Sequence, residues 1–126
     1  MYGRLLVMAF PTGEHSEDKF NQTLMRAIEE TIVALTGPSV LNSLYANLQN
    51  FHSIKRDMLP DNLHVLSGVL TATFGKDASK VVSRRIAIAL YARLRIHFSD
   101  IPSYSLTRYV EDAKRQVRPS DDESTP

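Results

Sequence analysis

The 126-residue chain contains no cysteine and no tryptophan. Without cysteine it can form neither a disulfide bond nor a zinc site with thiolate ligands, and it has no thiolate nucleophile. Glycine is also scarce, with only five residues: Gly3, Gly13, Gly37, Gly68 and Gly75. These glycines lie too far apart to form a phosphate-binding loop. The lack of disulfides favours a cytoplasmic protein.

Long hydrophobic runs are missing as well. No stretch approaches the roughly 18–20 apolar residues that a bilayer-spanning helix needs. Near the N-terminus a single charge, Arg4, precedes a short apolar run, Leu5 to Phe10, which Pro11 ends. A signal peptide needs about 7–15 apolar residues followed by a small-residue cleavage site. The sequence therefore predicts a soluble, unexported protein.

The composition is that of an ordinary globular domain, with 43% hydrophobic and 23% charged residues. Its net charge of +1 conceals an uneven distribution. Residues 1–75 hold five Lys/Arg against seven Asp/Glu, residues 76–118 hold ten against four, and the last eight residues add three acids. A basic segment followed by an acidic tail indicates either an anionic partner or compensation within the chain itself.

The two ends of the chain are expected to lie outside the folded domain. Residues 1–15 predict a flexible arm, in which the apolar residues that should bind a partner are Leu5, Leu6, Val7, Met8 and Phe10. So many apolar side chains are not expected to stay in water, so the arm should dock on the core or on a second subunit. Residues 118–126 contain no apolar side chain and predict a disordered acidic tail.

Residues 16–117 predict a single all-α domain of five helices. The first begins near an N-cap at Ser16 and ends at Gly37-Pro38. The second covers residues 39–51 and is expected to bury Phe51. The third runs from a cap at Asp61 or Asn62 to Gly75, and the last covers residues 104–117.

The fourth helix, Ala78 to Phe98, is expected to be the centre of the domain. It is the longest run without proline or glycine that also has many apolar residues. At 100° per residue these fall within one wide arc: Val81, Val82, Ile86, Ile88, Ala89, Leu90, Ala92 and Ile96. We therefore expect a helix that others cover on several sides, with Asp77 as its N-cap.

Arg85 and Arg93 project towards the middle of that apolar arc. Three interpretations are open for them. Their aliphatic stems could pack while the guanidinium groups reach water. They could pair with an acid on another helix, such as Glu29, Glu30 or Glu111. They could also form an anion site or a subunit contact.

The opposite face of the same helix presents a basic stripe with one aromatic residue: Lys80, Arg84, Tyr91 and Arg95. Nucleic-acid-binding surfaces often combine these residue types, and the two helices joined at Gly75 superficially resemble a helix-turn-helix. Basic residues along a helix are, however, more commonly a solvated face. The stripe is therefore a candidate anion or nucleic-acid face.

No residue pattern points to catalysis, a metal or a cofactor. The histidines stand singly, without the i, i+4 spacing of a metal-binding pair: His15, His52, His64 and His97. The serines lie at caps and turns, and none sits in the Gly-x-Ser-x-Gly sequence of a nucleophile elbow. We expect a non-enzymatic protein without a cofactor.

The segment Leu44 to Phe98 resembles the small helical "nitrosopumilus output domain" of archaea, in its fifth class. The matching features are Leu44-Tyr45 leading into His52-Ser53-Ile54-Lys55, the helix start Leu59-Pro60-Asp61, the turn Phe74-Gly75, and Leu90-Tyr91-Ala92-Arg93-Leu94. This resemblance implies a helical, non-enzymatic signalling output or interaction module of an archaeal cell. The family usually has an acid where this chain has Ser83-Arg84-Arg85, so no role of that acid transfers.

Two functional hypotheses follow from these observations. The first is a non-catalytic module that binds a protein, with a homodimer as one form, because the apolar arm and the fourth helix offer more apolar surface than a small monomer needs. The second is a nucleic-acid-binding regulator that uses the basic face of the fourth helix.

Overall fold

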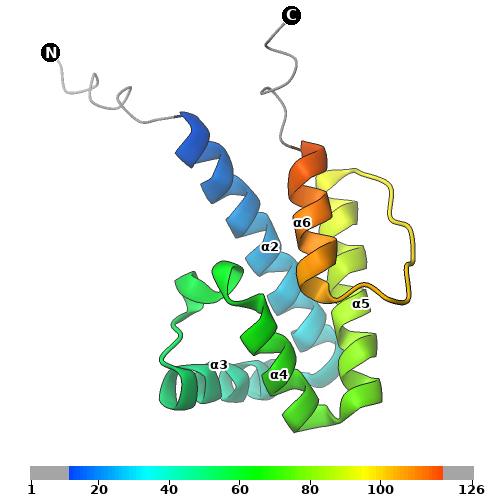
Figure 1. Ribbon diagram of the computed structural model, residues 1–126. Coiled ribbons are helices and arrows are strands. Elements are labelled where there is room, and N and C mark those ends of the chain that lie inside the picture. Colours follow the sequence, from blue (N-terminus) through cyan, green and yellow to red (C-terminus); the bar gives the residue numbers. More distant parts are fainter. Residues whose placement is uncertain (1–11, 118–126) are drawn as a thin grey trace, which may run out of the picture.

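The computed structural model describes the backbone of residues 12–117 and the side chains from residue 18 onward. This part of the chain is all-helical (Figure 1). Its elements are α2 (Thr12–Thr36), α3 (Pro38–His52), the 3₁₀ helix η1 (Arg56–Asp61), α4 (Leu63–Phe74), α5 (Lys76–Leu94) and α6 (Leu106–Val117). The five expected α-helices are all present. The apolar run Leu5–Phe10 and the acidic tail 118–126 lie outside the described residues.

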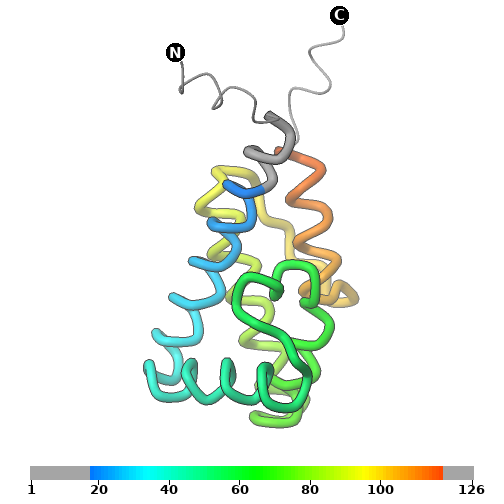
Figure 2. Tube along the Cα trace, turned by 90° about the vertical axis from the view of Figure 1, so that its left-hand side faces the viewer, coloured from blue at the N-terminus to red at the C-terminus, as the bar shows by residue number. Residues whose placement is uncertain are grey.

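The helices form a bundle, and we call the end of the bundle that α3 crosses its foot. α2 and α5 pack along each other in opposite directions, and α6 packs beside the second half of α5 (Figure 1). α3 crosses the foot of the bundle, and α4 packs against α3, α5 and α6 (Figure 2). The termini of the described chain lie together at the end opposite α3.

The core consists of aliphatic side chains from every element. The largest fully buried ones are Leu24, Ile28, Ile32, Leu48, Leu59, Leu66, Leu70, Ile86, Leu90 and Leu106. Helical periodicity places six residues on one face of α2, and five of them are buried while Leu35 is 41% exposed; the buried ones are Phe20, Leu24, Ala27, Ile28 and Thr31. Each such leucine or isoleucine stabilises the fold by about 1.5–3 kcal/mol through burial.

The helix breaks occur at the expected glycines. Gly37 and Gly75 have positive φ angles of 100° and 93°, a conformation that glycine adopts without the steric penalty of a Cβ. Gly75 ends α4 and directly precedes α5, which begins at Lys76. Asp77 therefore lies in the first turn of α5 and is not its N-cap. Asn62 is the N-cap residue of α4, as one of the two expected alternatives.

The boundary between the N-terminal arm and the first helix differs from the predicted one. α2 begins at Thr12 and not at Ser16, so residues 12–15 belong to the helix. The expectation that these four residues form part of an extended arm was wrong.

α5 is less apolar than the sequence predicted. It packs against α2, α4 and α6, and its buried residues are Ser79, Val82, Ile86, Ala87, Leu90 and Tyr91. Val81, however, is 54% exposed. The helix ends at Leu94, where Arg95 adopts a left-handed conformation with φ 60°, so residues 95–98 are not helical. Periodicity could not detect this end because the apolar spacing continues past it.

Phe51, in the last turn of α3, is more exposed than the sequence predicted, and Met58 in η1 is exposed as well. Ile54 and Leu59 are buried, but Met58 is 41% exposed and Phe51 is 76% exposed. The last turn of α3 runs past α2 at the foot of the bundle (Figure 1). Phe51 therefore continues the apolar stripe of α3 past its buried residues Leu44 and Leu48.

Candidate functional site

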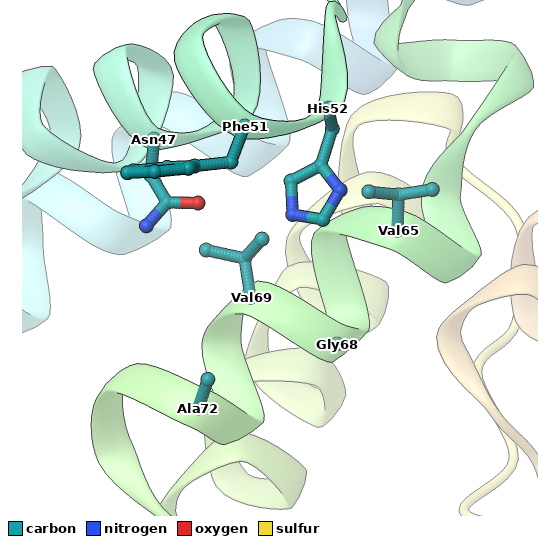
Figure 3. Close-up of a pocket in the computed structure, with 7 residues that line it drawn as sticks. All are labelled: Asn47, Phe51, His52, Val65, Gly68, Val69 and Ala72. Atoms are coloured by element: carbon teal, nitrogen blue, oxygen red, sulfur yellow. The ribbon is translucent and has the colours of Figure 1, made fainter.

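An apolar hollow lies between the end of α3 and one face of α4, with a volume of about 600 Å³. Figure 3 shows its lining residues, which are Asn47, Phe51 and His52 from α3 and Val65, Gly68, Val69 and Ala72 from α4. We call this surface the α3–α4 hollow. The side chains from α3 form one side of it, and the small side chains of α4 form the floor.

Gly68 keeps the floor of the hollow open. It lies inside α4, where glycine is less favourable than alanine by about 0.5–1 kcal/mol. A Cβ at this position would meet no atom within 4 Å. The glycine is thus required neither by backbone geometry nor by close packing, and a side chain here would enter the open space of the hollow.

A second concave surface, of about 670 Å³, lies on the neighbouring face of α4. We call it the basic groove. α4 contributes Ser67 and Thr71, and α5 contributes Lys76, Ser79, Lys80, Ser83 and Arg84. The segment that leads into α6 and its first turn contribute Asp100, Ile101, Pro102, Ser103, Tyr104, Ser105, Leu106 and Tyr109.

Three cations follow one side of α5 along this groove. Lys76, Lys80 and Arg84 are four residues apart, so each is about 6 Å further along the helix axis than the one before. All three are exposed. Arg84 Nε lies 3.1 Å from Asp100 Oδ1, and the hydrogen bond to this carboxylate raises the pKa of Arg84. Asp100 is the single acid among the described lining residues, which leaves Lys76 and Lys80 uncompensated.

The far wall of the groove is held in place by tyrosines. The Tyr109 hydroxyl donates a hydrogen bond to the Ile101 carbonyl at 3.0 Å and accepts one from the Ile101 N–H at 2.8 Å. The Tyr91 hydroxyl in turn donates to the Tyr109 carbonyl at 2.7 Å. The ring centroids of Phe98 and Tyr104 lie 5.2 and 5.1 Å from that of Tyr109. The irregular segment before α6 is therefore attached to both α5 and α6.

The structure brings together only part of the basic face expected from the sequence. Lys80 and Arg84 do lie together in the groove. Tyr91 is only 4% exposed, so its place on a solvent-facing basic surface was wrong, and burial raises its pKa. Arg95 lies at the far end of α5 and does not line the groove. Lys76 was missed because the helix was expected to begin at Ala78, although its i, i+4 spacing to Lys80 was visible.

Arg85 and Arg93 behave differently from each other. Arg93 forms an ion pair with Glu30 of α2, which agrees with the second of the three interpretations. Arg85 is exposed, and it has no ion pair among the described residues. Neither guanidinium group is fully buried.

Glu29 is the centre of a polar cluster that the sequence did not reveal. Arg56 Nε donates to Glu29 Oε2 at 2.6 Å, and Arg56 Nη2 donates to Oε1 at 3.1 Å. The Tyr45 hydroxyl donates to the same carboxylate. The hydrogen bond from Arg56 holds the pKa of Glu29 below its usual value, whereas burial and the nearby carboxylate raise the pKa of Tyr45. We call these three residues the Glu29 clamp, because they connect α2, α3 and η1.

Residues of the kinds that bind metals do not gather anywhere in the described part of the chain. Among the helices of residues 12–117, none combines the length and the apolar character that crossing a membrane requires.

No family model, no curated protein and no solved structure matches the chain. The resemblance of Leu44–Phe98 to the archaeal output-domain family therefore stays a prediction.

Proposed function

We propose that this protein is a non-catalytic interaction module that binds an apolar polypeptide segment in the α3–α4 hollow. The observation that supports this most directly is the 76% exposure of Phe51 beside the open space at Gly68. Large apolar groups grouped at a concave surface commonly mark a protein-binding site. Covering a phenylalanine side chain contributes about 1.5–3 kcal/mol to binding before ordering costs are subtracted.

The segment that best fits the hollow is Leu5–Phe10 of a second copy of the chain. This run consists of apolar residues only, which suits the apolar lining of the hollow.

We expect the hollow to be filled by a second molecule and not by the chain's own segment. α2 has 25 residues and is therefore about 37 Å long. Leu5 is seven residues from Thr12, a distance of at most about 25 Å. α3 and α4, whose residues line the hollow, lie away from the start of α2 (Figure 1). A neighbouring molecule can supply the segment without this restriction.

This arrangement predicts a closed dimer. Each copy has one apolar segment and one hollow, so a reciprocal exchange satisfies both copies about a two-fold axis. A signalling output role in an archaeal cell, as the family resemblance implies, is part of the same proposal. In that role, the dimer would be the unit that a signal assembles or separates.

Light scattering coupled to gel filtration tests the proposal. The full chain should elute as a dimer, and a version without residues 1–11 should elute as a monomer. Gly68→Leu should also be monomeric, since its side chain would enter the open space and occupy the hollow. Val81→Ser is the control, because it removes an exposed apolar side chain outside the hollow and should leave the dimer intact.

A full chain that is monomeric even at high concentration would contradict self-association. If truncation separates the dimer but Gly68→Leu does not, the apolar segment binds at a different surface. Circular dichroism of Gly68→Leu should show the helical content of the parent, because leucine is a better helix former than glycine.

A further inference from the structure

The basic groove is chemically different from the α3–α4 hollow and has no role in the proposed dimer. The two surfaces occupy neighbouring faces of α4, with Ser67 and Thr71 lining the groove and Gly68 and Ala72 lining the hollow. The hollow is mainly apolar, whereas the groove contains three cations and several hydroxyl groups. A binding site in the groove would therefore take a different class of ligand.

The lysines of the groove lie at the end of α5 where a helix favours acidic side chains. The N-terminal turns of a helix favour acidic side chains, because the helix dipole is positive there. α5 instead places Lys76 at its first position and Lys80 one turn later, with Asp77 as the one acid in the first turn. Its N-cap residue is Gly75, which offers no side-chain hydrogen bond. Such a local conflict is typical of residues kept for a ligand rather than for the fold.

The other polar side chains of the groove are mostly hydroxyl groups, which can donate a hydrogen bond to a ligand. The Ser105 hydroxyl accepts a hydrogen bond from the Arg108 N–H at 3.1 Å, so its own hydrogen is available to a ligand. Ser83 and Ser103 add two more hydroxyl groups from opposite walls. The carboxylate of Asp100 is already compensated by Arg84. The groove thus offers cations and hydroxyl donors to a ligand rich in acceptor oxygens.

We infer that the basic groove binds the phosphate groups of a ligand, with Lys76 and Lys80 as the principal charged contacts. Phosphate oxygens accept charge-assisted hydrogen bonds from lysine and hydrogen bonds from serine. Two ammonium groups on stems about 6 Å apart along the helix can bind neighbouring phosphates of a polyphosphate or of a single nucleic-acid strand. The Tyr104 ring is not open for base stacking on both faces, because Arg108 lies 4.6 Å from its centroid. Recognition therefore rests on phosphate.

Titration calorimetry with two probes tests this inference on the full chain. The probes are sodium tripolyphosphate and a short oligothymidylate, both at about 50 mM salt, where phosphate contacts are strong. Lys76→Glu/Lys80→Glu should weaken binding by about tenfold or more, because it replaces two attractive charges by two repulsive ones. Both glutamates suit the start of a helix, so this variant should fold, which circular dichroism can verify.

Arg26→Glu/Lys55→Glu is the matched control. Arg26 and Lys55 are exposed, lie outside the groove and have no ion pair among the described residues. This double reversal changes the net charge by the same amount, so binding should stay within about twofold of the parent if the groove is the site. Equal losses in the two double variants would overturn the inference, because they would show attraction to overall charge only.

The two probes also separate the sources of phosphate. Binding of tripolyphosphate alone would support a small phosphorylated ligand, and binding of oligothymidylate alone would support a nucleic-acid strand. For the strand, the slope of log affinity against log salt should decrease by about 1.4 in the groove variant, because two phosphate contacts are lost. If neither probe binds, the inference fails. Gly68→Leu should bind the probes like the parent, so this result is independent of the dimer.

Discussion

Gly37 and Gly75 each join two helices by themselves, and their backbones are nearly the same. Their φ angles are 100° and 93°, both have ψ 163°, and each N–H bonds to the carbonyl four residues earlier. The surroundings differ. α3 begins after Gly37 with Pro38, which suits a first helical position, whereas α5 begins after Gly75 with Lys76.

The charges near these two glycine turns, which we call the corners, also differ. In the first hairpin the Glu29 clamp joins α2 to α3 and η1, and each of its polar groups has a partner. In the second hairpin, Lys76 and Lys80 have no acid opposite them among the described residues of the groove. The comparison indicates that identical turns can serve different purposes. The first corner is optimised for stability, and the second retains charge for a ligand.

The largest loss of stability is expected when either of the two turn glycines is replaced. Gly37→Ala and Gly75→Ala should each lower the free energy of unfolding by about 1–3 kcal/mol, because an alanine is strained at these angles. A Cβ would meet no atom within 4 Å at either position, so the backbone is the sole cause and the two losses should agree. Urea denaturation measures both. A loss at only one of the two corners would show that they are not equivalent.

The Glu29 clamp should give the next largest effect. Glu29→Ala leaves the half-buried Tyr45 hydroxyl and Arg56 without their acceptor, and we expect a loss of about 1–2 kcal/mol in urea denaturation. Glu30→Ala is the control on the same helix. It removes an ion pair in which Glu30 is 60% exposed, and should therefore cost less than about 1 kcal/mol.

The clamp should also make stability depend on pH in the acid range. The pKa of Glu29 is lower in the folded chain than its ordinary value of 4.5, so the clamp contributes fully above that value. Its contribution is lost as the pH falls through the lower, folded-state pKa. The stability difference between the parent and Glu29→Gln should accordingly shrink between pH 5 and pH 3, by about 1 kcal/mol or less because the group is partly exposed. A difference that stays constant over this range would refute the lowered pKa.

The smallest change in the free energy of unfolding is expected for the lysines of the groove, and it should be an increase. Lys76→Glu/Lys80→Glu should raise the free energy of unfolding by about 0.5 kcal/mol, because it replaces cations at the positive end of α5 by acids. Thermal melting should therefore show a slightly higher Tm. The same change should weaken phosphate binding by about tenfold or more. A variant that loses both stability and binding would contradict the idea that these lysines are kept at a cost to the fold.

The sequence predicted the parts of this structure that depend on neighbours along the chain. The buried stripe of Leu24, Ala27 and Ile28 follows from helical periodicity, and the breaks at Gly37 and Gly75 follow from glycine's conformational freedom. The number and approximate bounds of the α-helices follow from the same two signals.

The burial and contacts that the sequence did not reveal depend on how the helices pack against one another. Periodicity placed Phe51 and Leu48 on one face of α3, but the packing of the other helices leaves one exposed and the other buried. Tyr91 contacts Phe98 in the segment before α6 and Tyr109 in α6 itself. Arg56 contacts Glu29, which is 27 positions away in the chain. The groove and the hollow are tertiary surfaces for the same reason, although the spacing of Lys76 and Lys80 was a usable signal.

The double hydrogen bond between Tyr109 and Ile101 has a consequence for how the groove meets its ligand. Residues 95–105 have no regular structure of their own, yet the amide of Ile101 should exchange with solvent slowly, as amides in helices do. A wall that is already ordered loses little conformational entropy when a ligand arrives. Tyr109→Phe would leave the fold largely intact but would transfer that ordering cost to the binding step.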